Sequence, residues 1–156
     1  MTTVPVILVV TFSDDIHALA LQWQLNARRN HSCHVLEVDR LPHTGRLSWS
    51  THNQGHPQVL VRGGHLLDVR TVTAIWWRRL HMIAATSGTN RVASNIITND
   101  SRAALEGMLW NENRGIWINN PDANRKAENK LNQLQVAQSA GFRIPKTLVS
   151  QDPAVI

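Results

Sequence analysis

The chain has 156 residues, a formal net charge of +5 and 42% hydrophobic residues, which is enough for the core of one domain and the beginning of a second. No apolar run approaches the roughly 20 residues of a membrane-spanning helix, and the N-terminus lacks the basic flank and cleavage site of a signal peptide. The single cysteine, Cys33, excludes an internal disulfide and fits a reducing cytoplasm. The basic residues are scattered, so the charge is a weak indication of an anionic ligand.

The first forty residues predict a βαβ unit. Val4–Val10 is a continuous apolar run, which is typical of a strand buried on both faces. Ser13 or Asp14 is expected to cap the next helix, and the apolar spacing predicts that its buried face holds Ile16, Leu19, Ala20, Trp23 and Ala27. A second strand, Cys33–Val38, follows. This succession predicts a parallel sheet with a right-handed crossover.

The middle of the chain is expected to form a small inserted meander. Gly45–Thr51 and Gln58–Val61 have the composition of short strands, and Gly63-Gly64 predicts a tight turn between the second of them and a further apolar pair. Thr73–Arg79 then returns as a strand that is apolar until its last two residues. The segment that follows, Ala84–Arg91, is predicted to be a loop.

Two helices and two strands are expected in the last third. One helix should begin near Ser94 or Asp100, end near Asn111 and bury Ala104, Leu105, Met108 and Leu109. Ile116–Asn119 is predicted to be a short strand. Asp122 is expected to cap the last helix, whose apolar face is predicted to hold Ala127, Leu131, Leu134 and Ala137 or Gln138.

The end of that last helix has its own signals. Gly141 supplies the left-handed residue that often follows a helix, and Phe142 is expected to fold back onto the last turn. The residues from Gly141 to Leu148, Gly-Phe-Arg-Ile-Pro-Lys-Thr-Leu, are predicted to open a new strand.

The sequence Trp76-Trp77-Arg78-Arg79 is a candidate binding site, because open α/β sheets bind ligands at the carboxyl ends of their strands. Two arginines there could hold a carboxylate or phosphate through paired hydrogen bonds. Strand alternation sends Arg78 and Arg79 to opposite faces, so they are not expected to serve one ligand together. The alternative is that the tryptophans pack under helices while the arginines form ion pairs at the rim.

Other classes of site are not supported. The pairs His31/His34 and His52/His56 have spacings that metals use, but a zinc site needs further ligands, and no metal site is predicted. There is no Walker A sequence and no dinucleotide-binding fingerprint after the first strand. A phospho-receiver domain is excluded, because Arg78-Arg79 stands where the phospho-accepting Asp would be required.

Motifs in both halves of the chain resemble one family. The succession Asn119-Asn120-Pro121, Asn129-Lys130-Leu131 and Gly141-Phe142 resembles the start of the ATP-grasp fold, where a ligase passes from its N-terminal domain to its nucleotide-binding domain. The hydrophobic first strand, Asp14-Asp15 with His17, the meander and Trp76–Arg79 resemble the N-terminal domain of the MvdD-type ligases. Those ATP-grasp enzymes, similar to glutathione synthase and the ribosomal S6 modification ligase, join side chains of ribosomally made peptides into ω-ester or ω-amide rings, as in microviridins.

The resemblance implies an α/β fold, a three-layer Rossmann-like pre-ATP-grasp domain with a mainly parallel sheet and a small inserted β-meander. It implies that residues 1–119 form the pre-ATP-grasp domain, and that residues 120–156 form a linking helix and the first strand of a truncated ATP-grasp domain. It also implies that Lys130 reaches the phosphates of ATP, as a Lys ammonium suits phosphate oxygens. A solvated position on an amphipathic helix is the alternative for Lys130.

The resemblance also implies a mechanism for the full-length parent. ATP-grasp ligases activate a carboxylate as an acyl phosphate, which an amine or hydroxyl then attacks, and they keep their magnesium ligands in the C-terminal part. Because the sequence ends at Ile156, the chain is expected to be a scaffold or substrate-cleft domain that alone neither hydrolyses ATP nor forms bonds. Whether the chain is an enzyme therefore stays open. Arg78, Arg79 and the Ser87–Arg91 loop are expected on the wall of the cleft.

The expected partners are a precursor peptide and the remaining ATP-grasp domain, in cis or in trans, with a homodimer left open. ATP and magnesium are expected for the parent, with no cofactor bound tightly to this chain alone, and no membrane partner is expected. The alternative function is a stand-alone anion- or nucleic-acid-binding α/β module, supported by the net charge and six tryptophans. Trp23, Trp76 and Trp117 fall in predicted core elements, so nucleic acid is the less favoured ligand.

Overall fold

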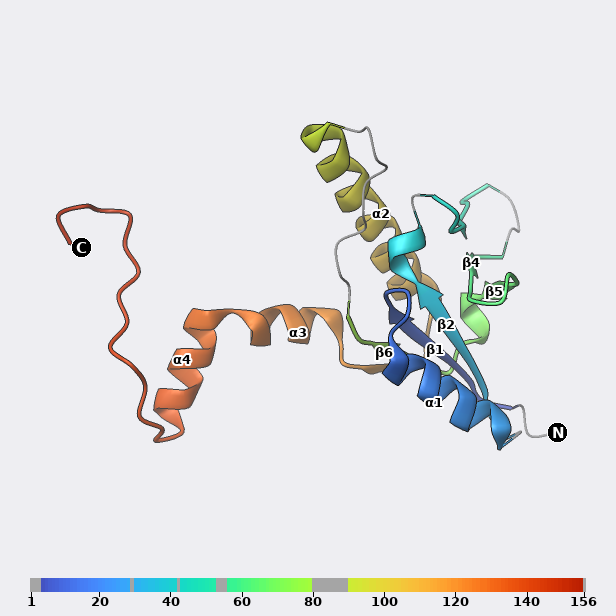
Figure 1. Ribbon diagram of the computed structural model, residues 1–156, viewed down its shortest axis with the longest axis horizontal. Coiled ribbons are helices and arrows are strands. Elements are labelled where there is room, and N and C mark those ends of the chain that lie inside the picture. The colour runs from blue at the N-terminus through green and yellow to red at the C-terminus, as the bar shows by residue number, and fades with distance from the viewer. Residues whose placement is uncertain (1–3, 29, 42, 53–55, 80–89, 156) are drawn as a thin grey trace. The chain divides into compact units, whose positions relative to one another are not determined.

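The structure of the chain is a computed structural model, which describes residues 4–28, 30–41, 43–52, 56–79 and 90–155. The chain divides into two compact units, residues 1–119 and residues 120–156 (Figure 1). The two units are described separately below.

Unit 1 is built on a four-stranded parallel sheet with the order β2-β1-β6-β7. Its strands are β1 (Val6–Thr11), β2 (Ser32–Glu37), β6 (Ala74–Trp77) and β7 (Ile116–Ile118). The parallel βαβ unit and the return of the tryptophan-rich strand are confirmed. The central strand β1 is apolar up to its last residue, Thr11, because other elements cover both faces of the sheet.

The helix between the first two strands is α1 (Ile16–Ala27). Its N-cap is Asp15, whose carboxylate accepts hydrogen bonds from the backbone N–H groups of His17 and Ala18. The prediction of Ser13 or Asp14 as the cap is therefore wrong by one or two residues. Asp14 adopts a positive φ of 61°, a conformation that Asp tolerates better than most residues and that turns the chain into the helix.

The predicted buried face of α1 is wrong. Ala18 is buried and Leu21 and Leu25 pack with it against the sheet, whereas Ile16 and Trp23 are both 72% exposed. Apolar residues occupy opposite sides of this helix, so periodicity alone does not choose between them. Hydrogen bonds decide the orientation.

Two amides of α1 bind the backbone of β2. Gln22 and Asn26 donate to the carbonyl oxygen of Cys33, each over 3.1 Å, and the Asn26 side-chain oxygen accepts from the Cys33 N–H over 2.7 Å. These contacts hold the Gln22 and Asn26 side of the helix on the sheet and leave Trp23 in solvent. Cys33 itself is buried, and burial raises the pKa of its thiol to about 11.

The inserted meander is confirmed as a separate antiparallel sheet with the order β3-β4-β5. Its strands are β3 (Leu47–Ser48), β4 (Gln58–Leu60) and β5 (Leu66–Asp68), and the first two are shorter than predicted. Gly63 and Gly64 form the turn between β4 and β5 with φ values of 96° and 83°, which only glycine adopts freely. Short 3₁₀ turns follow β2 and β5, at Val38–Arg40 and Val69–Thr71.

The long helix α2 (Arg91–Glu112) starts earlier than predicted, because the Asn90 side chain caps it by accepting from the Ala93 N–H. Leu105, Met108 and Leu109 are buried as predicted, whereas Ala104 is exposed. Of the predicted loop 84–91, residues 84–89 lie outside the described residues and Arg91 is already helical.

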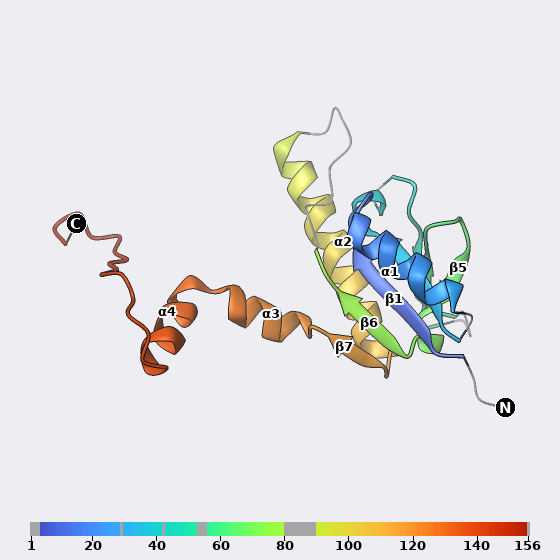
Figure 2. The same ribbon diagram turned by 60° about the horizontal axis from the view of Figure 1, so that its bottom comes forward.

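The core lies on both faces of the parallel sheet, in three layers. Helix α1 covers one face over Val9 and Val35, while α2 and the meander cover the other face. Figure 2 shows α1 and α2 on opposite sides of β1 and β6. The larger cluster joins the main sheet, the meander and α2 through buried side chains that include Leu8, Leu36, Val59, Val69, Ile75, Leu105 and Leu109. Trp77 and Trp117 pack in this layer with ring centroids 5.8 Å apart.

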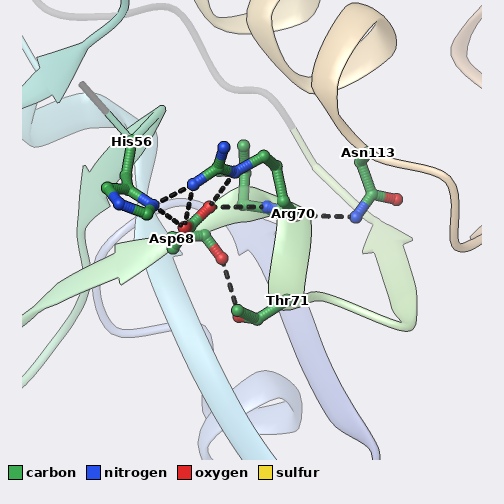
Figure 3. A network of polar contacts seen from close by, with 6 residues as sticks. His56, Asp68, Arg70, Thr71 and Asn113 are labelled. Atoms are coloured by element: carbon green, nitrogen blue, oxygen red, sulfur yellow. Dashed lines mark hydrogen bonds and ion pairs between the residues drawn. The ribbon is translucent and has the colours of Figure 1, made fainter. Parts of the chain in front are cut away.

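Asn113 joins the end of α2 to the 3₁₀ turn that follows β5. Its buried amide donates to the carbonyl oxygens of Val69 and Val72, over 2.8 and 2.7 Å, and its oxygen accepts from the Gly115 N–H. Figure 3 shows this side chain beside the turn that carries Arg70 and Thr71. A Cβ at Gly115 would lie 2.4 Å from the Thr73 carbonyl oxygen, so glycine is required where β7 begins.

Unit 2 has two helices where one was predicted. Helix α3 (Pro121–Glu128) is capped by Asn120, and helix α4 (Lys130–Ser139) by Asn129. Asp122 lies in the first turn of α3 and is not its cap, because the Asn120 side chain accepts from the Asp122 and Ala123 N–H groups. The chain breaks at Asn129 because its backbone is extended there.

The predicted apolar face of the last helix is not buried within unit 2. None of the residues of α4 is buried, and Leu131 is more than half exposed. The glycine signal is confirmed: Gly141 has φ 83°, and the N–H groups of Gly141 and Phe142 donate to the carbonyl oxygens of Gln138 and Ala137. The Phe142 side chain is exposed and does not fold back onto the helix.

The predicted strand after Gly141 does not form in the structure. Residues 142–150 have neither helical nor strand structure, since no strand of the described residues pairs with them. In the part of the chain that the structure describes, no helix is long and apolar enough to cross a membrane.

Candidate functional site at the carboxyl edge of the parallel sheet

Polar side chains collect where three neighbouring strands end. Thr11 ends β1, Glu37 ends β2 and Arg78 directly follows β6. Because the strands are parallel, their carboxyl ends meet at one edge of the sheet. This is the edge at which open α/β sheets bind ligands.

The first cluster at this edge is Thr11, Asp15 and Arg78. The Asp15 carboxylate accepts a 2.7 Å hydrogen bond from the Thr11 hydroxyl and a 2.6 Å bond from Arg78 Nε. The Asp15 side chain is 2% exposed and that of Arg78 is 16% exposed. The guanidinium also lies 4.9 Å from the ring centre of Trp76, the residue two before it on the same face of the strand. This cluster is closed to solvent.

The surroundings of Asp15 favour its ionised form. Burial by itself raises the pKa of this carboxyl, but the hydrogen bonds from Arg78, Thr11 and the Ala18 backbone, together with the positive charge of Arg78, lower its pKa well below the ordinary value of 3.8. Asp15 therefore stays charged at any physiological pH. It caps α1 and holds Arg78 at the same time.

The second cluster is Glu37, Arg40 and Arg62. The two carboxylate oxygens of Glu37 bind different arginines, Oε2 with Arg40 Nε at 2.8 Å and Oε1 with Arg62 Nη1 at 2.7 Å. The Glu37 side chain is 7% exposed, whereas those of Arg40 and Arg62 are 53% and 40% exposed. A buried carboxylate thus positions two guanidinium groups that reach water.

Ser13 and Asp39 extend the second cluster to the turn that follows β1. Arg40 Nε lies 3.0 Å from the Ser13 hydroxyl, and the Ser13 N–H donates to Asp39 Oδ1 over 2.8 Å. Ser13 lies in the turn between β1 and α1, and Asp39 lies in the 3₁₀ turn after β2. The second cluster therefore ties the turn after β2 to the turn after β1.

A cavity of about 460 Å³ opens beside the second cluster. Its lining includes Glu37, Arg40 and Arg62, with the Gly63-Gly64 turn of the meander on the other side. The meander is fixed there because the Arg62 N–H donates to the Val35 carbonyl oxygen of β2 over 2.8 Å. Two arginines and exposed glycine backbone suit a carboxylate or another small anion.

A second cavity, of about 720 Å³, lies between the meander and α2. Leu47, Trp49, Ala104 and Met108 are among its lining residues, and none of the lining side chains is charged. Trp49 is half exposed and its indole N–H donates to Glu112 over 2.7 Å. This cavity offers apolar surface and no group that could do chemistry.

The two predicted arginines have different surroundings. Arg78 is engaged by Asp15, as described above, and its backbone N–H donates to Val10. Arg79 is exposed and forms no hydrogen bond or ion pair with another described residue. Ser87–Thr89 of the predicted cleft loop lie outside the described residues, and Asn90 and Arg91 belong to the start of α2.

The predicted phosphate contact, Lys130, is the first residue of α4 in unit 2. Its ammonium donates to the neutral side chain of Gln133 over 3.1 Å and forms no ion pair with another described residue. A positive charge without a carboxylate partner, at the N-terminus of a helix, fits a phosphate. Among the described residues, no group of three or more His, Cys, Asp or Glu side chains is placed to hold a metal ion.

His34 and His56 contact neighbours outside this edge, whereas His17 Nδ1 lies 3.6 Å from Asp15 Oδ1. His34 Nδ1 lies 3.0 Å from His65 Nε2, and burial followed by the charge of His65 lowers the pKa of His34. His56 contacts Asp68, which also binds Arg70, as Figure 3 shows. That network is exposed and connects the start of β4 to β5, so it stabilises the meander locally.

Sequence reasoning missed most of the edge network. Thr11, Asp15, Glu37, Arg40 and Arg62 were not predicted as site residues. The position of Glu37 directly after the apolar pair Val35-Leu36 at the end of β2 was a usable signal, because a charge is placed there at the rim of the sheet. Arg62 gave no such signal, since only the folded meander brings it to β2.

The fold defines the class of this protein. It is an α/β domain with an arginine-lined cavity at the carboxyl edge of its parallel sheet. The family described as the MvdD pre-ATP grasp domain matches residues 6–125. The chain belongs to this family. None of the curated protein sequences matches it significantly.

Solved structures share the fold. The macrocyclase MdnC of Microcystis aeruginosa MRC, bound with precursor peptide MdnA, is similar over 96% of this chain and 48% of its own, with 24% identity and a TM-score of 0.81. The macrocyclase MdnB of the same source matches over 97% and 49%, with 23% identity and a TM-score of 0.80.

A RiPP-associated ATP-grasp ligase of Chryseobacterium gregarium, in complex with ADP and with a leader and core peptide, is also similar. It covers 97% of this chain and 46% of its own, with 20% identity and a TM-score of 0.72. The chain thus spans about half the length of the solved structures that it matches. At these identities the likeness establishes the fold.

Proposed function

We propose that this chain is the N-terminal scaffold and substrate-cleft domain of an ATP-dependent ligase that acts on a ribosomally made peptide. In the complete enzyme a carboxylate of the peptide would be joined to an amine or a hydroxyl. The observation that carries the proposal is the family match over residues 6–125, and the arginine-lined cavity beside Glu37 supports it. Similar proteins are described with a precursor peptide bound.

In this proposal the cavity receives an acidic group of the precursor peptide. Glu37 holds Arg40 and Arg62 by one face each, and their remaining N–H groups are free to bind a second carboxylate. The buried carboxylate fixes both guanidinium groups before the peptide arrives, which lowers the entropy cost of binding. The cavity then works as an anchor for the substrate and leaves the chemistry to another domain.

We propose different roles for the two arginines after β6. Arg79 is exposed without a described partner, and it would extend the cationic wall toward the peptide. Arg78 would position the start of α1 through Asp15, at the base of that wall. Ser87–Arg91 remains a proposed part of the wall as well.

The proposed boundary lies at residues 119 and 120. Residues 1–119 would form the pre-ATP-grasp domain, and residues 120–156 the linking helices and a first strand that pairs with the rest of the ATP-grasp domain, in cis or in trans. Lys130 would contact phosphate oxygens of ATP, which supplies the phosphoryl group that activates the carboxylate. Magnesium would be held by the remaining domain, and the cytoplasm is the proposed location.

Peptide binding tests the cavity. We expect the 156-residue chain to bind a synthetic acidic precursor peptide, measured by calorimetry, and the same peptide with its Asp and Glu residues changed to Asn and Gln to bind at least about tenfold more weakly. The double variant Arg40→Met with Arg62→Met should lose this preference. The matched control is Arg70→Met, which removes a similarly exposed, ion-paired arginine from the 3₁₀ turn after β5.

Ligation tests the function as a whole. With ATP, magnesium and a complementary ATP-grasp domain, the chain should convert the precursor peptide to a product lighter by one water per ring, read by mass spectrometry. The chain alone is expected to give neither product nor magnesium-dependent ATP hydrolysis. Binding that ignores peptide acidity but follows single-stranded nucleic acid, and weakens steeply with salt, would instead support the stand-alone binding module.

A further inference from the structure

The turn between β4 and β5 forms one wall of the arginine-lined cavity and is docked on β2. The pair Gly63-Gly64 in this turn lines the cavity. At the start of the turn, the Arg62 N–H donates to the carbonyl oxygen of Val35 over 2.8 Å. At its end, His65 Nε2 lies 3.0 Å from Nδ1 of His34, a residue of β2. The shape of the cavity therefore depends on contacts at both ends of the turn.

The contact between His34 and His65 is a hydrogen bond between two imidazole rings. The rings meet edge to face, with their centroids 4.9 Å apart and their planes at 70°. One facing nitrogen must carry a hydrogen and the other must offer a lone pair, so at least one ring has to be neutral. The Ser32 hydroxyl lies 2.8 Å from the second nitrogen of His34 and orients that ring. When both rings are protonated, the bond is lost and two positive charges face each other.

The strands around this pair carry no carboxylate that is left without an arginine, as far as the described residues go. Neither β1 nor β4 has a titratable side chain. In β2, the Cys33 thiol is neutral because burial raises its pKa to about 11. The carboxylates of β2 and β5 are held by arginines, Glu37 by Arg40 and Arg62, and Asp68 by Arg70. A second proton on the histidine pair therefore meets charges that are already compensated.

The surroundings of His34 favour its neutral form. Burial, followed by the charge of His65, lowers the pKa of His34 below its ordinary value of 6.5. Because this pKa is lowered in the docked state, His34 takes up a proton more readily when the contact is open. The contact therefore stabilises the docked turn above pH 6.5, and this stabilisation is lost as the pH falls through the lowered pKa of His34.

We infer that His34 and His65 form a pH-sensitive switch, which holds the turn on β2 while at least one ring is neutral and releases it when both are protonated. Only residues 62–65 are released, because Val59 and Leu67 in the adjoining strands are buried in the core. Release moves the wall that Gly63-Gly64 forms, so the cavity is complete at neutral pH and opened by acid. The inference concerns the shape of the cavity and does not depend on the proposed ligase function.

Hydrogen exchange of the full chain, followed by NMR, tests the switch. The Arg62 N–H is the reporter, because it bonds directly to β2. Its protection, corrected for the intrinsic effect of pH on exchange, should fall at least about fivefold between about pH 7.5 and about pH 5, as expected for the loss of one hydrogen bond. The Val69 N–H, which donates to Pro57 over 2.9 Å at the other end of the meander, should keep its protection.

Two histidine variants separate the switch from a general effect of acid. In His65→Gln, the glutamine amide can donate to His34 or accept from it and does not titrate, so the fall in Arg62 protection should disappear. The matched control is His56→Gln. His56 is an exposed histidine before β4 whose partner is the Asp68 carboxylate (Figure 3), so its protonation strengthens its contact and the variant should respond to pH as the wild type does.

Three results would each overturn the inference. The first is Arg62 protection that stays unchanged between the two pH values in the wild type. The second is an equal fall in the wild type and in His65→Gln, and the third is an equal fall at Arg62 and Val69. Circular dichroism melts check that both variants fold. The ring C–H resonances of His34 should titrate in the wild type over the pH range in which Arg62 loses its protection.

Discussion

The two ion clusters at the carboxyl edge differ in their access to water. In the closed cluster, both Asp15 and Arg78 are withdrawn from solvent, and the carboxylate also caps α1. In the open cluster, Glu37 is buried but Arg40 and Arg62 reach solvent beside the cavity. We infer from this comparison that the two clusters have different roles. The closed cluster stabilises the fold, and the open cluster binds the ligand.

The largest expected effect is on the closed cluster. Arg78→Met should lower the free energy of unfolding by about 3 kcal/mol, because it leaves the buried Asp15 carboxylate without its charged partner. Urea denaturation measures this loss. Arg70→Met, which breaks an exposed pair with Asp68, should cost less than about 1 kcal/mol. Equal losses in the two variants would mean that burial does not distinguish the clusters.

A smaller loss is expected at the open cluster. Glu37→Gln keeps the shape of the side chain and one acceptor oxygen, and the guanidinium group that loses its acceptor can be solvated, so we expect a loss of about 1 kcal/mol. The same variant should weaken binding of the acidic peptide, since the arginines lose their fixed orientation. Denaturation and calorimetry on one preparation separate the two effects. A loss of unfolding free energy as large as that of Arg78→Met would mean that the main role of Glu37 is to stabilise the fold.

The pH dependence of stability should trace to the closed cluster. The pKa of Asp15 in the folded state lies below its ordinary value of 3.8, so its ionised form stabilises the fold above that pH. This contribution is lost as the pH falls below about 3.8 towards the folded-state pKa. The stability difference between wild type and Asp15→Asn should therefore shrink on acidification in a pH series of urea unfolding curves. A constant difference would show that the charge of Asp15 adds nothing.

The smallest effect on stability is expected in unit 2. Lys130→Met should not change the unfolding curve measurably, because the Lys130 ammonium has only a neutral hydrogen-bond partner among the described residues. In the protein completed by an ATP-grasp domain, the same variant should raise the KM for ATP. Lys126→Met, on α3, is the control and should leave that KM unchanged. Equal effects of both would favour the solvated position for Lys130.

Much of unit 1 was predictable from the sequence. The apolar run of β1, the crossover to β2 and the turn glycines Gly63 and Gly64 each have a local cause, so the parallel sheet and the meander followed from them. The family resemblance added the fold class, and the family match supports it. The lengths of β3 and β6 were overestimated because composition does not show where pairing partners end.

Less of the candidate site was predictable. Arg78 and Arg79 were singled out by their position after a strand, but nothing in the sequence tells which of them meets a carboxylate from α1. Arg62 reaches Glu37 only because the meander folds back on β2. The contact between Arg62 and Glu37 joins residues 25 positions apart, and that between Arg78 and Asp15 joins residues 63 positions apart. Such contacts depend on how the layers pack, and the local sequence pattern does not predict them.

Helix α1 shows the difference between what the sequence determines and what the tertiary structure determines. Its existence follows from the sequence, because helix-forming residues run from Ile16 to Ala27 behind a capping carboxylate. Its orientation was decided by tertiary structure alone. Apolar residues line both sides, and the helix turned Leu21 and Leu25 inwards because Gln22 and Asn26 bind the backbone of β2 at Cys33. A periodic pattern sets which residues share a face, whereas only the packed sheet decides which face is buried.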